Sequence, residues 1–234
     1  MRRSWNKAGC ARWGWGRRNE IGSFAFGSHV TVRCFNVALS KSIERAKEFG
    51  IWLHERANDR NIPSGLRERT GAKILQHSLD IDDAILILLD AQLPGPALTL
   101  VRPLFESYVR GVWLLQISSD NEIEEFINGK CPTFYELLEA IGNDQQSGGA
   151  WIHANKNANW SSFNDLTHGG NQHVKRRNTQ EAIEPNYPES ELEALIRFGI
   201  EVRIRIGCIL LSLMNDEVAT GQLSEKANSL RISP

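Results

Sequence analysis

The sequence predicts an all-α protein: a bundle of four long helices with several short ones, preceded by an irregular N-terminal arm. Apolar residues recur three and four positions apart over long stretches, which is the period of a helix with one buried face. Proline and glycine fall between these stretches, where turns are needed. No two segments alternate apolar and polar residues as the strands of a hairpin do.

The four long helices are predicted over residues 36–58, 65–92, 97–117 and 188–215. A short Pro-Gly turn over residues 93–96 separates the second from the third, so these two should pack antiparallel. Pro103 lacks the amide proton of a helix interior, so it either kinks the third helix or lies in its first turn. The first helix has a continuous apolar stripe: Leu39, Ile43, Ala46, Phe49, Leu53 and Ala57.

Shorter helices are expected over residues 119–127 and 133–141. Each begins with a capping box, formed by Ser119 with Glu122 and by Thr133 with Glu136. Residues 150–187 are less regular, and short helical turns are expected there over 150–158 and 161–167. We expect a single bundle domain over residues 36–216 and a loose C-terminal tail over 217–234.

Residues 1–35 show no helix or strand period and carry seven basic side chains against Glu20 alone. The rest of the chain is acidic, and the whole chain has a net charge of −1. The arm is predicted to be disordered, or to be translated from an upstream start; its tryptophans and arginines would also suit nucleic-acid binding. The acidic body does not favour general attraction to nucleic acid.

Several function classes lack their sequence signals. The four cysteines follow no metal-ligand spacing, so we expect reduced thiols in a cytoplasmic protein and no metal site. No apolar run reaches the ~18–20 residues of a membrane helix, so no membrane association is expected. Neither a phosphate loop nor a dinucleotide fingerprint occurs, and no cofactor is predicted.

Charged residues interrupt apolar stripes at three places. Asp82 lies within a leucine stripe, Arg203 shares a face with isoleucines, and three residues of the third helix form a series spaced by four: Arg102, Glu106 and Arg110. Because an unpaired buried charge is costly, Asp82 should pair with Arg102, Arg110 or Arg203. A ladder of alternating charge on the last long helix is predicted to face solvent: Glu193, Arg197, Glu201 and Arg205.

A second cluster of polar residues surrounds His168. Asn164 lies one helical turn before it, and Gly169 with Gly170 should end the helix, so the helix dipole would favour a protonated imidazole. Such a histidine suits general acid catalysis or phosphate contact, and it equally suits an ordinary helix cap. We predict a concave site that presents His168, Asn164 and at least one nearby cation, from Arg102, Arg110, Lys175 or Arg176.

Two family resemblances involve these residues. The segment Arg102-Pro103-Leu104-Phe105-Glu106, with Tyr108, Arg110-Gly111, Trp113 and later His168-Gly169-Gly170, resembles an uncharacterised family of bacterial helical proteins over about residues 36–215. More distantly, Asn164 and His168 resemble the polar residue and the histidine in the motif of HEPN-superfamily helical ribonucleases. Phe163 stands where that motif has arginine, so Arg102 or Arg110 would have to supply the charge.

These patterns leave two hypotheses. One is a non-catalytic helical binding or scaffold protein that grips a partner through its polar residues. The other, implied by the HEPN resemblance, is a metal-independent RNA endonuclease in which His168 is the general acid–base, Asn164 orients the phosphate and Arg102 stabilises its charge. The partner would be RNA or another phosphate-bearing ligand, and self-association into a homo-oligomer is compatible with both. Further binding residues are predicted around this site: Glu106, Arg110, Asn171, Lys175 and Arg176.

Overall fold

The computed structural model describes residues 35–58, 60–142, 147–177, 179 and 183–232. Every regular element in these residues is a helix, which confirms the predicted all-α class. Residues 1–34 of the predicted arm lie outside the described residues, so that prediction stays a prediction. The helices are α1 (Val37–Ala57), α2 (Leu66–Asp90), α3 (Pro94–Thr99), α4 (Val101–Gln116), α5 (Asp120–Ile127), α6 (Phe134–Ile141), α7 (Gly149–Thr167), α8 (Asn171–Lys175), α9 (Glu189–Leu213) and α10 (Glu217–Ile232).

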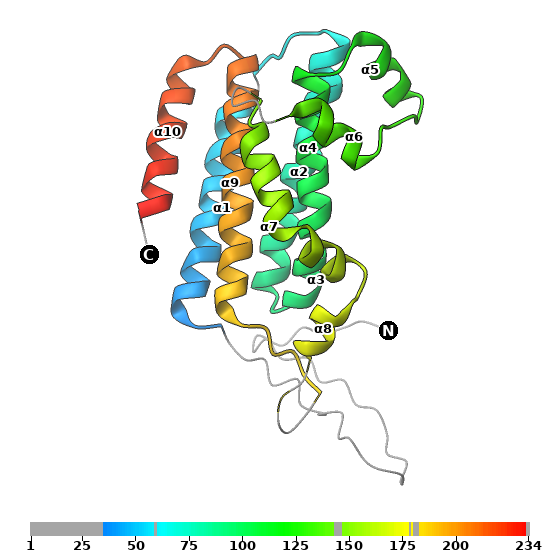
Figure 1. Cartoon of the computed structure of the whole chain (residues 1–234). Coiled ribbons are helices and arrows are strands. Elements are labelled where there is room, and N and C mark those ends of the chain that lie inside the picture. Colours follow the sequence, from blue (N-terminus) through cyan, green and yellow to red (C-terminus); the bar gives the residue numbers. More distant parts are fainter. Residues whose placement is uncertain (1–34, 59, 143–146, 178, 180–182, 233–234) are drawn as a thin grey trace, which may run out of the picture.

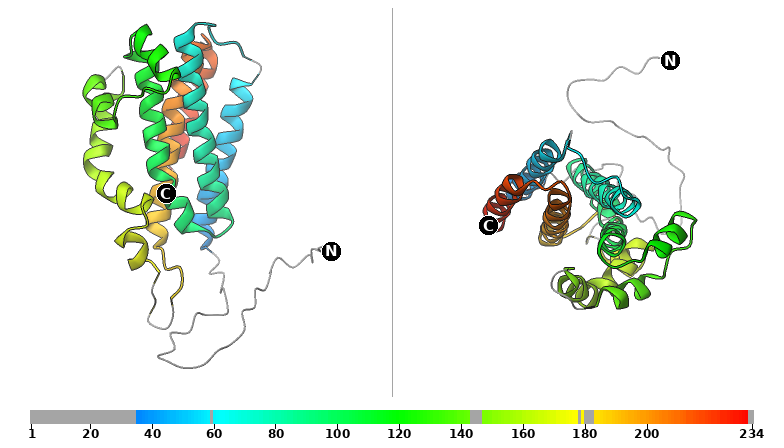
Figure 2. Two further views of the ribbon diagram at one scale, coloured as in Figure 1. Left: turned by 90° about the vertical axis from the view of Figure 1, so that its right-hand side faces the viewer. Right: turned by 90° about the horizontal axis from the view of Figure 1, so that it is seen from above.

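The long helices α1, α2, α4 and α9 run side by side (Figure 1). Helix α2 packs most extensively against α4, and α9 packs against α1, α2 and α4. The chain reverses between α2 and α4 through the short α3, so the predicted antiparallel hairpin is confirmed. Helix α7 covers the outer side of α4, while α5 and α6 lie at one end of the bundle and α8 at the other (Figures 1 and 2).

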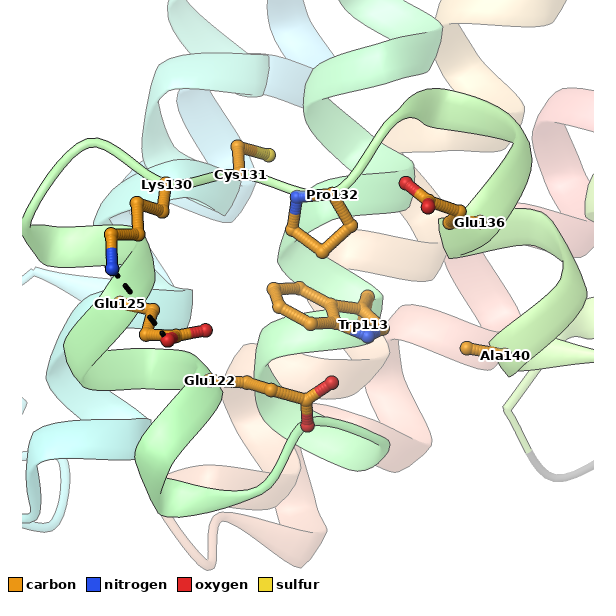
Figure 3. A pocket seen from close by; sticks show the side chains of 8 residues that line it. All are labelled: Trp113, Glu122, Glu125, Lys130, Cys131, Pro132, Glu136 and Ala140. Atoms are coloured by element: carbon orange, nitrogen blue, oxygen red, sulfur yellow. Dashed lines mark ion pairs between the residues drawn. The ribbon is translucent and has the colours of Figure 1, made fainter.

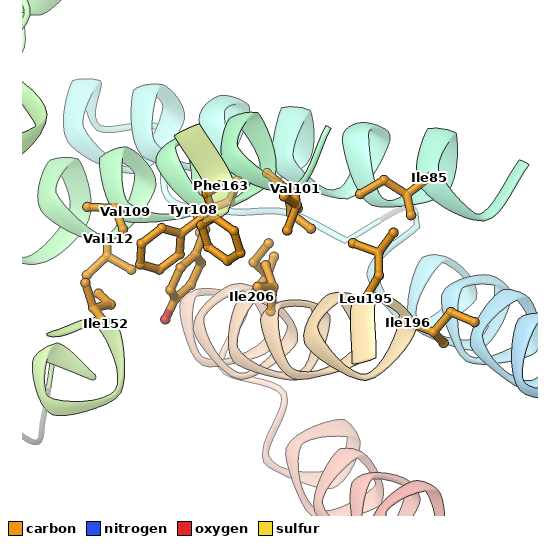
Figure 4. Packing of buried hydrophobic residues seen from close by; sticks show 14 of the residues in the cluster. Ile85, Val101, Tyr108, Val109, Val112, Ile152, Phe163, Leu195, Ile196 and Ile206 are labelled. Carbon is orange, nitrogen blue, oxygen red and sulfur yellow. The ribbon is translucent and has the colours of Figure 1, made fainter. Parts of the chain in front are cut away.

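The core lies where α2, α4, α7 and α9 meet, as Figure 4 shows. Ile85 of α2, Val101 of α4 and Leu195 of α9 are among the fully or nearly fully buried side chains. Close helix contact depends on glycine: a Cβ at Gly111 of α4 would overlap the side chain of Leu75 on α2. The apolar stripes of the sequence therefore predict this core correctly.

The third predicted helix is divided at Leu100 into α3 and α4, with Pro103 in the first turn of α4. Proline cannot donate the backbone hydrogen bond to the carbonyl of Thr99 that a continuous helix would contain. That carbonyl instead accepts a 3.3 Å hydrogen bond from the hydroxyl of Thr167, the last residue of α7. The break in the helix thus anchors the end of α7 beside the start of α4.

Helix α7 corrects one prediction, because it is continuous where two short turns were expected. Its sequence is rich in asparagine and serine, which are weak helix formers. Contacts with α4, α6 and α9 compensate: Phe163 is buried against Phe105 and Phe198, and Ile152 is fully buried. Tertiary packing overrides local propensity in this segment.

The C-terminal segment corrects a second prediction, since residues 217–232 form α10 rather than a loose tail. Asp216 accepts a 2.9 Å hydrogen bond from the backbone amide of Ala219 and thereby caps the helix. Ala219, Leu223 and Ala227 are buried in a second core cluster, which they share with Phe49 of α1 and other residues. The packed body therefore extends past residue 216.

Candidate functional site

A row of three charged side chains lies on α4, each only partly exposed. Arg102 Nε donates to Glu106 Oε1 at 2.6 Å, and both terminal nitrogens of Arg110 donate to Glu106 Oε2 at 3.1 Å. Glu106 therefore binds two guanidinium groups, one from the residue one helical turn before it and one from the residue one helical turn after it. The row carries a net positive charge on a surface that α7 approaches.

His168 reaches this row from the end of α7. It is the C-cap residue of that helix, and Gly169 follows in the left-handed conformation with φ of 67°. Arg102 Nη1 lies 2.8 Å from His168 Nε2. Because arginine can only donate, Nε2 must accept and the ring proton must sit on Nδ1. In this contact His168 is an acceptor at Nε2 and keeps a donor at Nδ1.

Trp160 completes the support of Arg102. The Arg102 guanidinium carbon lies 4.9 Å from the centroid of the Trp160 indole ring, and that indole stacks on the ring of Phe134 with centroids 4.5 Å apart. Sequence reasoning did not select Trp160. The available signal was its spacing, because Trp160, Asn164 and His168 follow one another at intervals of four on one face of α7.

An open cleft of about 420 Å³ lies beside His168. Asp165 shapes one wall, where its carboxylate accepts hydrogen bonds from the backbone amides of Asn171 at 3.2 Å and Gln172 at 2.5 Å. These bonds fix the start of α8 and partly offset the negative charge of Asp165. The cleft is lined by Ser161, Asn164, Asp165, His168, Gly170, Asn171 and Gln172.

None of the four predicted cations lines the cleft, and Arg102 adjoins it through its contact with His168. Arg176 makes a two-pronged ion pair with Glu191 at 2.5 and 2.7 Å, and this hydrogen bonding raises its pKa. Lys175 is exposed, and Arg110 is held by Glu106. Of the four cations that the sequence offered, the structure therefore brings Arg102 to His168.

His173 lies a few residues after His168, and its contacts are those of a structural residue. Its Nε2 lies 2.7 Å from the carbonyl of Leu166, and its Nδ1 lies 2.9 Å from the hydroxyl of Tyr187. The carbonyl can only accept, so Nε2 carries the proton and Nδ1 accepts from tyrosine. Both ring nitrogens of His173 are thus engaged within the protein, whereas no described residue bonds Nδ1 of His168.

A different ionic cluster is buried between α2 and α9. Arg203 Nε donates to Asp82 Oδ2 at 2.8 Å, and Arg203 Nη2 lies 2.7 Å from Asp83 Oδ1. This confirms that Asp82 pairs with one of the three predicted arginines. Two glycines make room for the pair, because a Cβ at Gly199 would overlap Asp82 and a Cβ at Gly50 would overlap Arg203. Burial raises the pKa of Asp82, and Arg203 opposes that shift.

The charge ladder on α9 is only partly a solvent face. Arg197 is exposed and lies 3.6 Å from Glu193, as predicted. Arg205, however, turns inward, and its guanidinium carbon lies 4.3 Å from the ring centroid of Trp151. Its Nε is buried and has no hydrogen-bond partner among the described residues. The pattern of alternating charge gave no sign that the last arginine covers an aromatic ring.

The comparisons with known proteins identify a family but no activity. A family model described as "Family of unknown function (DUF6988)" matches residues 75–231. No curated protein and no solved structure matches the chain. The match starts within α2 and includes α10, so it begins and ends later than the resemblance expected over 36–215. An uncharacterised family was therefore predicted correctly. Among the helices of the described residues, none contains an apolar stretch of the length that a membrane crossing requires.

Proposed function

The chain belongs to the DUF6988 family, which brings no assigned activity with it, and we propose that it is a binding module for a phosphate-bearing ligand. The ligand site is the cleft beside His168, together with Arg102. One observation carries the proposal: Arg102 Nη1 and His168 Nε2 are 2.8 Å apart at the edge of an open polar cleft. The proposal retains the binding hypothesis and specifies its ligand.

Three donors serve an anion in this arrangement. Arg102 keeps a guanidinium charge beside the cleft, and arginine is well suited to phosphate oxygens. Its donation to Nε2 places the ring proton of His168 on Nδ1, which then donates to a second oxygen. The Asn164 amide offers a third donor from one turn earlier on α7. Trp160 and Glu106 hold the guanidinium in place before the ligand arrives.

Binding is favoured over catalysis because His168 lacks a free basic nitrogen in this arrangement. A general base needs an available lone pair, and Nε2 uses its lone pair to accept from Arg102. RNA cleavage remains the second candidate, since Arg102 brings from α4 the positive charge that Phe163 does not supply on α7. In that case Arg102 moves to the scissile phosphate and releases Nε2 to act as the base.

The test compares binding and cleavage on the same protein. We would titrate the full chain with a labelled single-stranded RNA oligonucleotide and follow its fluorescence anisotropy at two salt concentrations. Arg102→Gln should weaken binding by about tenfold, as expected for one charge-assisted hydrogen bond. Arg197→Gln removes the same charge from an exposed side chain on α9 and should leave the affinity nearly unchanged.

Incubation of the same RNA in EDTA reports cleavage without metal. Binding without cleavage supports the binding module. Cleavage that disappears in His168→Ala supports the nuclease instead. If Arg102→Gln and Arg197→Gln weaken binding equally, or if neither RNA nor inorganic phosphate binds, the proposed site is wrong.

A further inference from the structure

A second cleft, of about 790 Å³, lies between α1, α2 and α9, away from the site beside His168. Its volume falls in the range of about 300–1,000 Å³ that is usual for small-molecule sites. Apolar side chains from α1, α2 and the end of α9 form part of its wall: Leu53, Ala72, Leu79, Leu210 and Met214. Charged side chains at its two ends decide which molecule it can bind.

Arg203 supplies a donor that the protein itself leaves unused. Its side chain is 3% exposed and lines the cleft, and its hydrogen bonds to Asp82 and Asp83 use Nε and Nη2. No described residue accepts from Nη1, which lies beside Gly50, where a Cβ would overlap it. The enclosed side-chain nitrogen without a partner in the described residues is Nε of Arg205, so Nη1 of Arg203 reaches open space. A buried guanidinium nitrogen that faces a cleft is expected to meet an acceptor there.

This buried donor distinguishes the cleft from the one between α5 and α6 (Figure 3). There Lys130 Nζ lies 3.9 Å from Glu125 Oε1, and the two side chains are 75% and 47% exposed. Solvated charges of that kind gain little from pairing. Arg203, in contrast, is held by two carboxylates before any ligand arrives, so its free N–H groups need no further ordering on binding.

The ligand atom that meets Arg203 is expected to be an uncharged oxygen. Asp82 and Asp83 already balance the guanidinium charge, and the Asp80 carboxylate also lines the cleft. A ligand carboxylate at this end would be repelled by Asp80 and Asp83. A hydroxyl accepts from Nη1 without that repulsion and has its own proton to donate to a carboxylate.

The other end of the cleft is cationic. Arg69 and Lys73 lie four residues apart on α2, so they share one face of that helix, and both line the cleft. Both are exposed, and no described residue makes an ion pair with either, whereas Arg60 nearby is paired with Asp216 at 3.2 Å. Lys73 is nine residues from Asp82, which is about 14 Å along the axis of α2. An anionic group is therefore favoured at this end, well separated from Arg203.

We propose that this cleft binds a medium-chain hydroxy acid, a small molecule with a carboxylate at one end of an alkyl chain and a hydroxyl at the other. The carboxylate pairs with Arg69 and Lys73, the chain lies on the apolar wall, and the hydroxyl accepts from Nη1 of Arg203. Burial of the chain drives binding, and the two polar ends fix its direction.

The experiment titrates the full chain with ω-hydroxydecanoate by isothermal calorimetry. Two analogues test the ends of the ligand, because decanoate lacks the hydroxyl and the α,ω-decanediol lacks the carboxylate. Each analogue should bind about tenfold more weakly, as expected when a hydrogen bond to a charged group is lost. The analogues replace a substitution of Arg203, which would disturb its buried pair with Asp82.

One pair of variants tests the cationic end. Lys73→Gln should weaken ω-hydroxydecanoate by about tenfold and leave the affinity for the diol unchanged, because the diol has no carboxylate. Lys41→Gln removes the same charge from an exposed lysine of α1 that does not line the cleft. This control should have little effect on either ligand.

Met214 reports where the ligand lies. The chain has two methionines, Met1 and Met214, and the second lines the cleft. In protein with isotope-labelled methionine methyl groups, ω-hydroxydecanoate should shift the methyl resonance of Met214. Met214→Leu assigns that resonance by removing it.

Four results would overturn the proposal. Absence of binding at millimolar ω-hydroxydecanoate would remove the ligand class. Equal weakening by Lys73→Gln and Lys41→Gln would indicate unspecific charge attraction, and equal affinity for decanoate would remove the contact with Arg203. A Met214 resonance that does not move at saturating ligand would place the ligand outside the cleft. The probes carry no phosphate, so none of these outcomes depends on the cleft beside His168.

Discussion

Two ionic clusters interrupt apolar helix faces in this protein, and their surroundings differ. Asp82 and Arg203 are each about 3% exposed and lie against the backbones of Gly199 and Gly50. The Arg102 side chain is 24% exposed, contacts an aromatic ring and contacts His168, which lines an open cleft. Among the described residues Asp82 lines no cleft, although Arg203 and Asp83 border one of about 790 Å³, whereas the contact of Arg102 with His168 leaves donors that a ligand can use. The two clusters therefore differ in the burial of the carboxylate that holds the arginine: Asp82 is about 3% exposed, and the Glu106 side chain is 16% exposed.

The largest expected effect tests the buried pair. Asp82→Ala should lower the free energy of unfolding by about 3–5 kcal/mol, because it leaves the Arg203 guanidinium buried without its main partner. Urea unfolding monitored by circular dichroism measures this change. Asp83→Ala is the matched control, since Asp83 binds the same guanidinium from a side chain that is 55% exposed. A loss below about 1 kcal/mol for Asp82→Ala would remove the distinction between the clusters.

The glycines around the buried pair give the second prediction. Gly199→Ala places a Cβ against Asp82 and should destabilise the protein by about 1–3 kcal/mol, the usual cost of overpacking. Gly221→Ala, in α10, meets no atom within 4 Å and should stabilise the helix by roughly 0.5–1 kcal/mol. Thermal unfolding of the two variants should therefore show shifts of opposite sign. Stabilisation by both would mean that the Asp82 pair is loosely enclosed.

The sequence predicted the long helices well because their apolar stripes are broad. Helix α10 was missed because its buried stripe is narrow and consists of Ala219, Leu223 and Ala227, two of them small. Nothing local distinguishes such a stripe from an exposed helix or a tail. The helix is stabilised by packing against α1 and α9, which only the folded structure reveals.

The candidate site was predictable in composition but not in its contacts. The spacing of Asn164 and His168 placed both on one face of α7, yet four cations were available as their partner. The choice of Arg102 depends on Thr167, whose hydroxyl bonds the carbonyl that Pro103 leaves free. Arg176 is excluded by its pair with Glu191, a residue distant enough in sequence that no spacing rule connects them.

The third prediction concerns the stability of the open cluster. Arg102→Gln should change the free energy of unfolding by less than about 1 kcal/mol, because its pair with Glu106 is partly solvated. The same substitution should weaken phosphate binding, so stability and binding respond separately. Unfolding and RNA binding measured on one preparation provide the comparison. A stability loss similar to that of Asp82→Ala would make Arg102 a structural residue.

The smallest expected effect concerns a carboxylate at the surface, Glu122, which completes the comparison between enclosed and open charges. The backbone amide of Ser119 hydrogen-bonds this carboxylate and lowers its pKa below the ordinary value of 4.5. A carboxyl group whose pKa is lower in the folded than in the unfolded protein stabilises the fold at pH values above its unfolded pKa. That stabilisation is lost as the pH falls through the pKa of the group in the folded protein. Glu122→Gln keeps the cap but cannot ionise, so it should melt slightly below the native protein at pH 7. The two melting temperatures should converge as the pH falls below about 4.5 and then below the folded pKa of Glu122. A difference that is the same at pH 7 and pH 3 would show that the charge of Glu122 contributes nothing, and that the capping hydrogen bond alone accounts for its role.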